Sequence, residues 1–192
     1  MGGVAVRRAG LALGAASHYR GGVDDLLHYF AYGSNLHPAR MRLRVPSAAP
    51  LGCAVLTGHQ LRFHKRSRHD GSAKCDAFYT GRPQDRVYGA VYRLVAADKA
   101  ALDAIEGPDY DIAERVVIRA GRPQPVFLYR ARPQAIADDL RPFDWYHALV
   151  VAGARHHGLP AAYIDVLAAI PSCRDPDPAR AGRELALLAT AN

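Results

Sequence analysis

Apolar residues follow two kinds of spacing along the chain, and the change from one to the other separates the expected strands from the expected helices. Before about residue 95, and again over 114–131, short apolar or alternating runs lie between Gly, Pro and Asp-Gly turn signals. This pattern is typical of β-strands. It predicts six or seven strands, at 27–32, 51–66 with a break at Gly58, 73–80, 86–94, 114–120 and 125–131.

Helical spacing appears mainly in the second half of the chain. Pro38 is a good first-turn residue and begins a short helical stretch. Ala101, Leu102 and Ile105 form an apolar stripe that Gly107-Pro108 ends. Longer helices are expected at 143–157 and 159–171. Because strands and helices do not alternate, the order predicts an α+β fold with a mostly antiparallel, strongly curved sheet.

The same pattern predicts one domain with a segment at either end. The domain is expected at 28–175, with a flexible N-terminal extension at 1–27 and a C-terminal tail with helical character at 176–192. The apolar run at 10–16 is short and rich in Gly and Ala, which disfavours a secretory signal. No run approaches the roughly 18 apolar residues of a membrane span, so no membrane partner is expected.

Charge and composition narrow the class of ligand. The 192 residues carry 25 basic and 18 acidic side chains, a net charge of +7, which suits an anionic small molecule. The strongest basic cluster, 64–69, is short, so nucleic acid is not expected as the partner. Three cysteines form no disulfide framework, which favours a reduced, cytoplasmic location. The nine histidines lack a spaced ligand set, so no metal is expected. Oligomeric state is left open.

The strongest local motif is Tyr32-Gly33-Ser34-Asn35-Leu36, directly after the first expected strand. Gly, Ser and Asn favour a turn, and the helix expected at Pro38 follows. Consecutive backbone N–H groups of such a turn can bind an anion or an oxyanion. A plain tight turn is the alternative reading of the same residues.

Two further side chains are candidates for chemistry. Glu106 falls in the last turn of an expected helix, where the helix dipole disfavours an ionised carboxylate, as suits a group that exchanges protons. A solvated helix-end glutamate is the alternative. Asp103, one turn earlier, is expected to be a cap or surface residue. Tyr146 opens the long helix and presents a hydroxyl either to a ligand or to the surface of the core.

Taken in order, these motifs resemble the γ-glutamylcyclotransferase family. The run 29–36 is similar to its signature loop, and 87–92 and 102–107 follow at the family's spacing. Tyr146 and the segment 158–163 resemble its C-terminal helices, so the similarity covers about 28–175. The basic segment at 64–75 looks closer to bacterial members than to the enzymes of glutathione turnover.

The resemblance implies a small α+β fold around a barrel-like sheet flanked by helices. It implies that Glu106 is the acid/base and that the loop binds substrate, through Tyr32, Gly33, Ser34, Asn35, Leu36 and His37, with Tyr146 as a further substrate contact. It also implies that a γ-glutamyl group is cyclised to 5-oxoproline with release of an amine or amino acid, without a cofactor.

Three other functions remain open from the residues. A hydrolase or deacylase of γ-glutamyl amides would use Ser34 or Cys75 as nucleophile, with His69 or another histidine as base. A second is a non-catalytic protein of the same fold that binds a small molecule. A nucleic-acid binder would use the cluster at 65–69.

Overall fold

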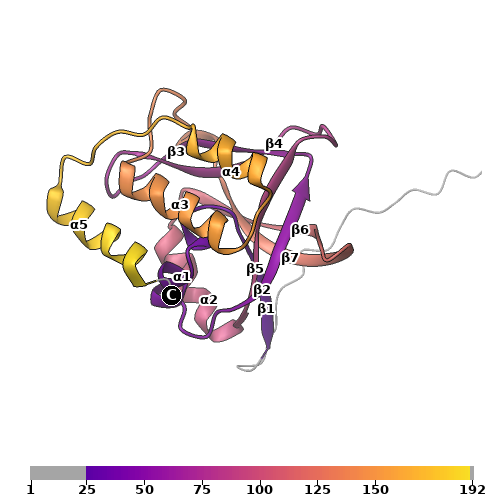
Figure 1. Cartoon of the computed structure of the whole chain (residues 1–192). Coiled ribbons are helices and arrows are strands. Elements are labelled where there is room, and N and C mark those ends of the chain that lie inside the picture. The colour runs from indigo at the N-terminus through magenta and orange to yellow at the C-terminus, as the bar shows by residue number, and fades with distance from the viewer. Residues whose placement is uncertain (1–24, 191–192) are drawn as a thin grey trace, which may run out of the picture.

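Five strands close into a barrel in the computed structural model, which describes residues 25–190 (Figure 1). β1 is antiparallel to β5 along its whole length and meets β7 at one parallel pair, Tyr29 opposite Phe127. All other pairings between the seven strands are antiparallel, so the expected α+β fold with a mostly antiparallel, barrel-like sheet is confirmed. The barrel order is β1 (Leu26–Ala31), β5 (Arg86–Val95), β2 (Ala49–Thr57), β6 (Tyr110–Arg119) and β7 (Arg122–Ala131).

A separate hairpin of two strands, β3 (His59–Arg66) and β4 (Ala73–Tyr79), follows β2. Gly58 separates β2 from β3 with a φ of +73°, a conformation that favours glycine, so the predicted break is confirmed. Within the hairpin, Lys65 lies opposite Lys74. This register places two cations side by side, which is destabilising unless anions are close.

The hairpin of β6 and β7 differs from the sequence prediction. Strands were expected at 114–120 and 125–131, but the turn between them falls at Ala120 and Gly121, both with positive φ, and Pro123 lies within β7. A two-residue turn of this kind matches the twist of the flanking strands. The first half of β7 pairs with β6 alone, and a strand edge without a second partner tolerates proline.

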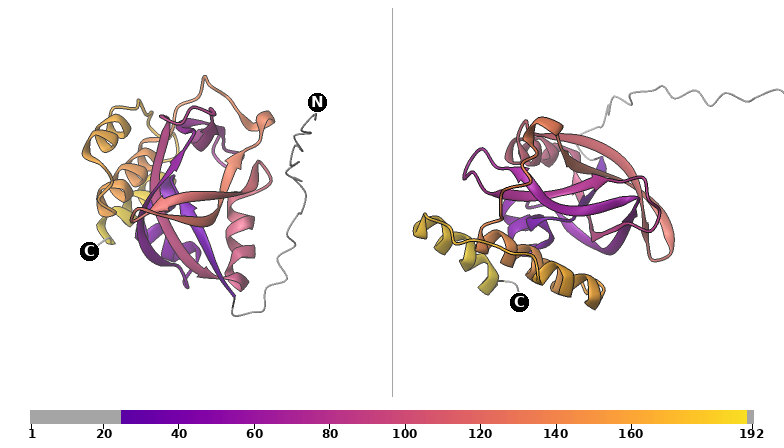
Figure 2. Two further views of the ribbon diagram at one scale, coloured as in Figure 1. Left: turned by 90° about the vertical axis from the view of Figure 1, so that its right-hand side faces the viewer. Right: turned by 90° about the horizontal axis from the view of Figure 1, so that it is seen from above.

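The helices lie on two sides of the barrel. In Figure 2, α3, α4 and α5 (orange to yellow) gather on one side of the strands, and α2 (pink) lies on the opposite side in the left view. None of the helices among residues 25–190 is long and apolar enough to cross a membrane. Their bounds are α1 (Pro38–Arg44), α2 (Ala96–Glu106), α3 (Asp144–His156), α4 (Ala161–Ala168) and α5 (Pro178–Ala186), with 3-10 turns at Ser34–Leu36, Pro133–Ala135 and Leu187–Thr190.

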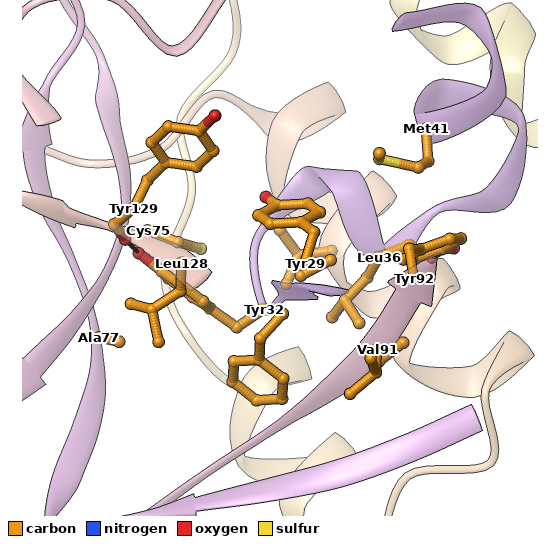
Figure 3. Packing of buried hydrophobic residues seen from close by; sticks show 14 of the residues in the cluster. Tyr29, Tyr32, Leu36, Met41, Cys75, Ala77, Val91, Tyr92, Leu128 and Tyr129 are labelled. Carbon is orange, nitrogen blue, oxygen red and sulfur yellow. Dashed lines mark hydrogen bonds between the residues drawn. The ribbon is translucent and has the colours of Figure 1, made fainter. Parts of the chain in front are cut away.

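The core fills the barrel and continues under the loop after β1. Figure 3 shows Tyr32 between Leu128 of β7 and Val91 of β5, and Leu36 beside Tyr92. β1 begins at Leu26, inside the segment expected as an extension at 1–27, and residues 1–24 of that segment lie outside the described residues. The expected tail at 176–192 contains α5, which packs against α3.

Candidate active site

A cavity of about 520 Å³ lies between the mouth of the barrel and the helices. Its walls include six of the eight site residues that the sequence suggested, although they come from three distant parts of the chain. Those six are Tyr32, Gly33, Ser34, Asn35, Glu106 and Tyr146.

Glu106 lies at the end of α2 with its carboxylate held by two donors. Asn35 Nδ2 donates to Oε1 at 2.8 Å, and Arg44 Nη1 donates to the same oxygen at 3.3 Å. Among the described residues, Oε2 receives no hydrogen bond, and 15% of the side chain is exposed. The alternative of a freely solvated glutamate does not fit this geometry, because one oxygen is fixed while the other stays available.

Asn35 connects the loop to the end of α2. Its Nδ2 also donates to Tyr29 Oη at 3.0 Å, and its Oδ1 accepts from Arg44 Nη1 at 2.7 Å. Burial raises the pKa of Tyr29 well above its usual range, and the nearby Glu106 carboxylate adds to the shift. Tyr29 therefore stays neutral. Arg44 and Asn35 therefore hold each other as well as the Glu106 carboxylate, so the three side chains form one hydrogen-bonded group.

The backbone of the loop offers a narrower set of donors than the sequence suggested. The N–H of Leu36 donates to Gly33 O at 2.9 Å and that of His37 to Ser34 O at 3.1 Å, so the 3-10 turn uses both. Within residues 25–190, the N–H groups of Gly33, Ser34 and Asn35 have no acceptor. Three successive donors therefore remain for a ligand, at the wall of the cavity.

Gly33 is required here for space rather than for backbone freedom. Its φ is −104°, which any residue adopts. A Cβ at Gly33 would lie 3.1 Å from Tyr146 Oη and 3.2 Å from Cys75 Cβ, tighter than ordinary van der Waals contact. Glycine thus lets the loop backbone approach β4 and α3.

Leu36 and His37 do not line this cavity, because the 3-10 turn carries them behind the loop. Leu36 is fully buried beside Tyr92 (Figure 3), and Tyr92 Oη donates to its carbonyl at 3.2 Å. His37 is also buried and faces a different depression, which His147 and His156 line. The predicted loop is therefore divided, with four residues at the cavity and two in the core.

The two predicted tyrosines have hydroxyls that are bound to the backbone. Tyr146 Oη accepts from the Cys75 N–H at 3.1 Å, and Tyr32 Oη donates to the Tyr129 carbonyl, a bond that Figure 3 marks. Burial raises the pKa of both tyrosines well above the usual range. Both rings are thus fixed, neutral parts of the wall.

Several cavity residues were not found by sequence reasoning, and most of them are charged. Lys74 Nζ donates to Asp70 Oδ2 at 2.7 Å and to Ser72 Oγ at 2.8 Å, and it lies 4.6 Å from the centre of the Trp145 ring. Burial lowers the pKa of Lys74 to about 8 despite the Asp70 carboxylate. Lys65 lies opposite Lys74 only because the register shifts at a bulge between Phe63 and Lys65, which the alternation of the sequence does not predict. The missed cations at the cavity are Arg40, Arg44, Lys65, Lys74 and Arg180.

The lining is rich in cations. Five lysines and arginines face the cavity against three carboxylates, Asp70, Glu106 and Glu184. Lys65 is buried, 3.9 Å from Asp109 and 4.6 Å from the centre of the Tyr110 ring, and makes no closer ion pair among the described residues. A cavity with this lining suits an anionic small molecule. No group of three or more potential metal ligands occurs within residues 25–190.

The residues that a hydrolase or a nucleic-acid binder would use are not arranged for those functions. Burial raises the pKa of the Cys75 thiol to about 12, so little thiolate is present near neutral pH. His69 makes no side-chain hydrogen bond to Ser34 or Cys75 among the described residues. In the basic cluster, Lys65 is buried and Arg68 forms a two-bond ion pair with Asp109. Cys75 is therefore not an activated nucleophile, and two cations of the basic cluster face Asp109.

Comparisons with known proteins agree with this geometry. The model of the AIG2-like family matches residues 86–167. The gamma-glutamylcyclotransferase of Homo sapiens is 32% identical over 157 residues, 77% of this chain and 80% of that protein. The enzyme of the same name from Mus musculus is 31% identical over 147 residues, 74% and 77% of the two chains. A solved gamma-glutamyl cyclotransferase, 28% identical, superposes with a TM-score of 0.69 over 77% of this chain and 89% of its own. The chain belongs to the gamma-glutamylcyclotransferase family.

Proposed function

We propose that this protein cyclises the γ-glutamyl group of a small substrate to 5-oxoproline and releases an amine or amino acid. The α-amine attacks the γ-carbonyl carbon of the same group, a C–N bond forms, and the original C–N bond to the leaving amine breaks. Water takes no part in this reaction. Holding the folded-back substrate supplies much of the rate, since well-oriented intramolecular attack is worth about 7–11 kcal/mol.

Glu106 is the general acid and base in this proposal. Its free Oε2 accepts the proton of the attacking amine and returns a proton to the leaving nitrogen, a role worth about 10²–10⁴-fold in rate. Asn35 and Arg44 donate to Oε1 and thereby orient the carboxylate. The observation that carries the proposal is this carboxylate, fixed at one oxygen and free at the other, at the wall of the cavity.

The loop and the cations bind the charged parts of the substrate. The unpaired N–H groups of Gly33, Ser34 and Asn35 stabilise the negative charge that develops on the γ-carbonyl oxygen. Lys65, whose nearest carboxylate is 3.9 Å away, binds the α-carboxylate of the γ-glutamyl group. Cyclisation is favoured over hydrolysis because the groups that a hydrolase would use, Ser34 and Cys75, have no paired base among the described residues.

A screen of γ-glutamyl amino acids, peptides and amines for 5-oxoproline release tests the proposal. An N-acetylated γ-glutamyl substrate serves as the matched control, because its blocked α-amine cannot cyclise although its amide bond can still be hydrolysed. We expect 5-oxoproline from the free substrates and no product from the acetylated one. Free glutamate in place of 5-oxoproline would indicate a hydrolase, and binding without turnover would indicate a non-catalytic protein.

A further inference from the structure

The cavity extends beyond Glu106 to a second end that lies beneath α5. Three cations line this end, one from α1, one from β4 and one from α5 itself: Arg40, Lys74 and Arg180. Glu184, also on α5, and Trp145 complete the wall. The proposed function uses none of these side chains. We call this set of five residues the α5 subsite.

Two of the three cations are paired with carboxylates close to them in the chain. Lys74 pairs with Asp70 four residues earlier, and Arg180 donates two hydrogen bonds to Asp175 five residues earlier. The Asp70 and Asp175 carboxylates also accept backbone N–H groups of their own turns, at Ser72 and Asp177. These pairs are therefore built into local structure and do not depend on a ligand.

Arg40 is different, because its partner comes from the far end of the chain. Its guanidinium forms an ion pair with Glu184, which is 144 residues away in the sequence. The Arg40 side chain is 8% exposed, whereas that of Glu184 is 25% exposed. Arg40 Nε is buried and has no hydrogen-bond partner among the described residues. Arg40 is thus a buried cation with an unused donor, and Glu184 lies closer to solvent.

A buried guanidinium needs a counter-charge, since a charge left unpaired in the interior is costly. Glu184 provides that charge in the structure, and a carboxylate of a bound ligand can replace it one for one. The exchange keeps Arg40 neutralised while the displaced Glu184 moves toward solvent. Arginine also binds carboxylates through two parallel hydrogen bonds, which the unused Nε allows.

We propose that Arg40 binds an acidic group on the leaving part of the substrate, and that Glu184 occupies this position until such a group displaces it. This inference rests on the proposed function, since the leaving part is defined by the cyclisation. It makes Arg40 and Glu184 specificity-determining residues. The protein then prefers γ-glutamyl compounds whose released amine carries a carboxylate over those whose released amine is uncharged.

Two substrates that differ only in this group provide the test. γ-Glutamylglycine and γ-glutamylglycinamide share the scissile bond, and only the first carries a carboxylate on the leaving part. The readout is the ratio of their kcat/KM values, measured by 5-oxoproline release. We expect the acid to be favoured at least about 10-fold by the unmodified protein, as hydrogen bonds between charged groups allow.

The variants separate the two roles. Arg40→Gln is expected to reduce the ratio by about 10-fold, whereas Glu184→Gln is expected to raise it several-fold, because it removes the competing carboxylate. Arg42→Gln is the matched control: it removes an arginine from the same helix, but Arg42 is exposed and does not line the cavity. If Arg40→Gln does not fold, Arg40→Lys and Glu184→Gln keep the proposal testable.

The outcomes are distinct. Opposite shifts of the ratio in the Arg40 and Glu184 variants support the α5 subsite. Equal turnover of the acid and the amide, or a ratio that is the same in all variants, overturns the subsite but leaves the proposed function standing. Release of 5-oxoproline from neither substrate, nor from any other γ-glutamyl compound, overturns the proposed function together with the subsite.

Discussion

Gly153 of α3 lies directly behind the loop that carries Ser34 and Asn35, and it gives the most specific structural prediction. A Cβ at Gly153 would lie 2.5 Å from Leu36 Cβ and 2.6 Å from both Leu36 C and His37 N. Two of these three atoms belong to the backbone, so no side-chain rotation relieves the contact. The variant Gly153→Ala must therefore displace the loop or the helix.

The expected losses of stability and activity in Gly153→Ala follow from these distances. Ordinary contacts begin near 3.4 Å, so relief requires a shift of close to 1 Å. A misplacement of about 1 Å in a catalytic group can cost about 10²-fold in rate. Overpacking typically costs about 1–3 kcal/mol, against a gain of about 0.5–1 kcal/mol for alanine over glycine within a helix. We expect a net loss of about 1 kcal/mol in the free energy of unfolding and a much larger loss of activity.

Gly182→Ala is the matched control, because Gly182 lies in α5 and a Cβ there would meet nothing within 4 Å. Urea denaturation and 5-oxoproline release are measured for both variants. We expect Gly182→Ala to be slightly more stable than the unmodified protein and fully active. A Gly153→Ala protein with normal kcat and KM would refute the claim that the close approach of α3 positions the loop.

Three further predictions follow from the site. Gly33→Val should abolish substrate binding, measured by calorimetry, because its side chain would enter the space of Tyr146 Oη and Cys75 Cβ; unchanged affinity would contradict this. Tyr146→Phe should lower the free energy of unfolding by about 1–3 kcal/mol in urea, because it leaves the buried Cys75 N–H unpaired; an equally stable variant would show that another acceptor replaces the hydroxyl. The lowered pKa of Lys74, about 8 in the folded protein against 10.5 when unperturbed, means that the unfolded chain binds more protons between these values. The free energy of unfolding of the unmodified protein should therefore rise relative to that of Lys74→Met between pH 8 and 10.5. A difference between the two free energies that does not change with pH would contradict this.

Short-range rules predicted the elements that depend on neighbouring residues. The break at Gly58 follows from a positive φ, and the end of α2 follows from Gly107, whose φ is +76°. The loop motif at 32–36 was also found, because turn-forming residues directly follow an apolar strand. Its division into a cavity-facing part and a buried part was not predicted, since that depends on the 3-10 turn and on the packing of Leu36 against Tyr92.

Residues that act through distant partners were missed. From the sequence, Arg44 is only a cation in the last turn of a short helix. In the structure it donates a hydrogen bond to Glu106, which is 62 residues later in the chain. Lys74 is buried by Trp145, which is 71 residues later in the chain. Tyr146 was expected to contact substrate and does line the cavity, but the bond that its hydroxyl accepts from the Cys75 N–H, 71 residues away in the sequence, was not predicted. Such contacts arise from barrel closure and helix packing, which local patterns do not encode.

The central claim is that Glu106 transfers the protons of cyclisation, and Glu106→Gln tests it most directly. Glutamine keeps the shape and can still accept from Asn35 and Arg44 at Oε1, but it cannot carry the proton. Asp103→Asn is the control, because Asp103 lies one turn earlier on α2, is 37% exposed and does not line the cavity. We expect kcat for 5-oxoproline release to fall at least about 10²-fold in Glu106→Gln, with substrate still bound, and to stay near normal in Asp103→Asn. A Glu106→Gln protein that releases 5-oxoproline at a near-normal rate would contradict the account.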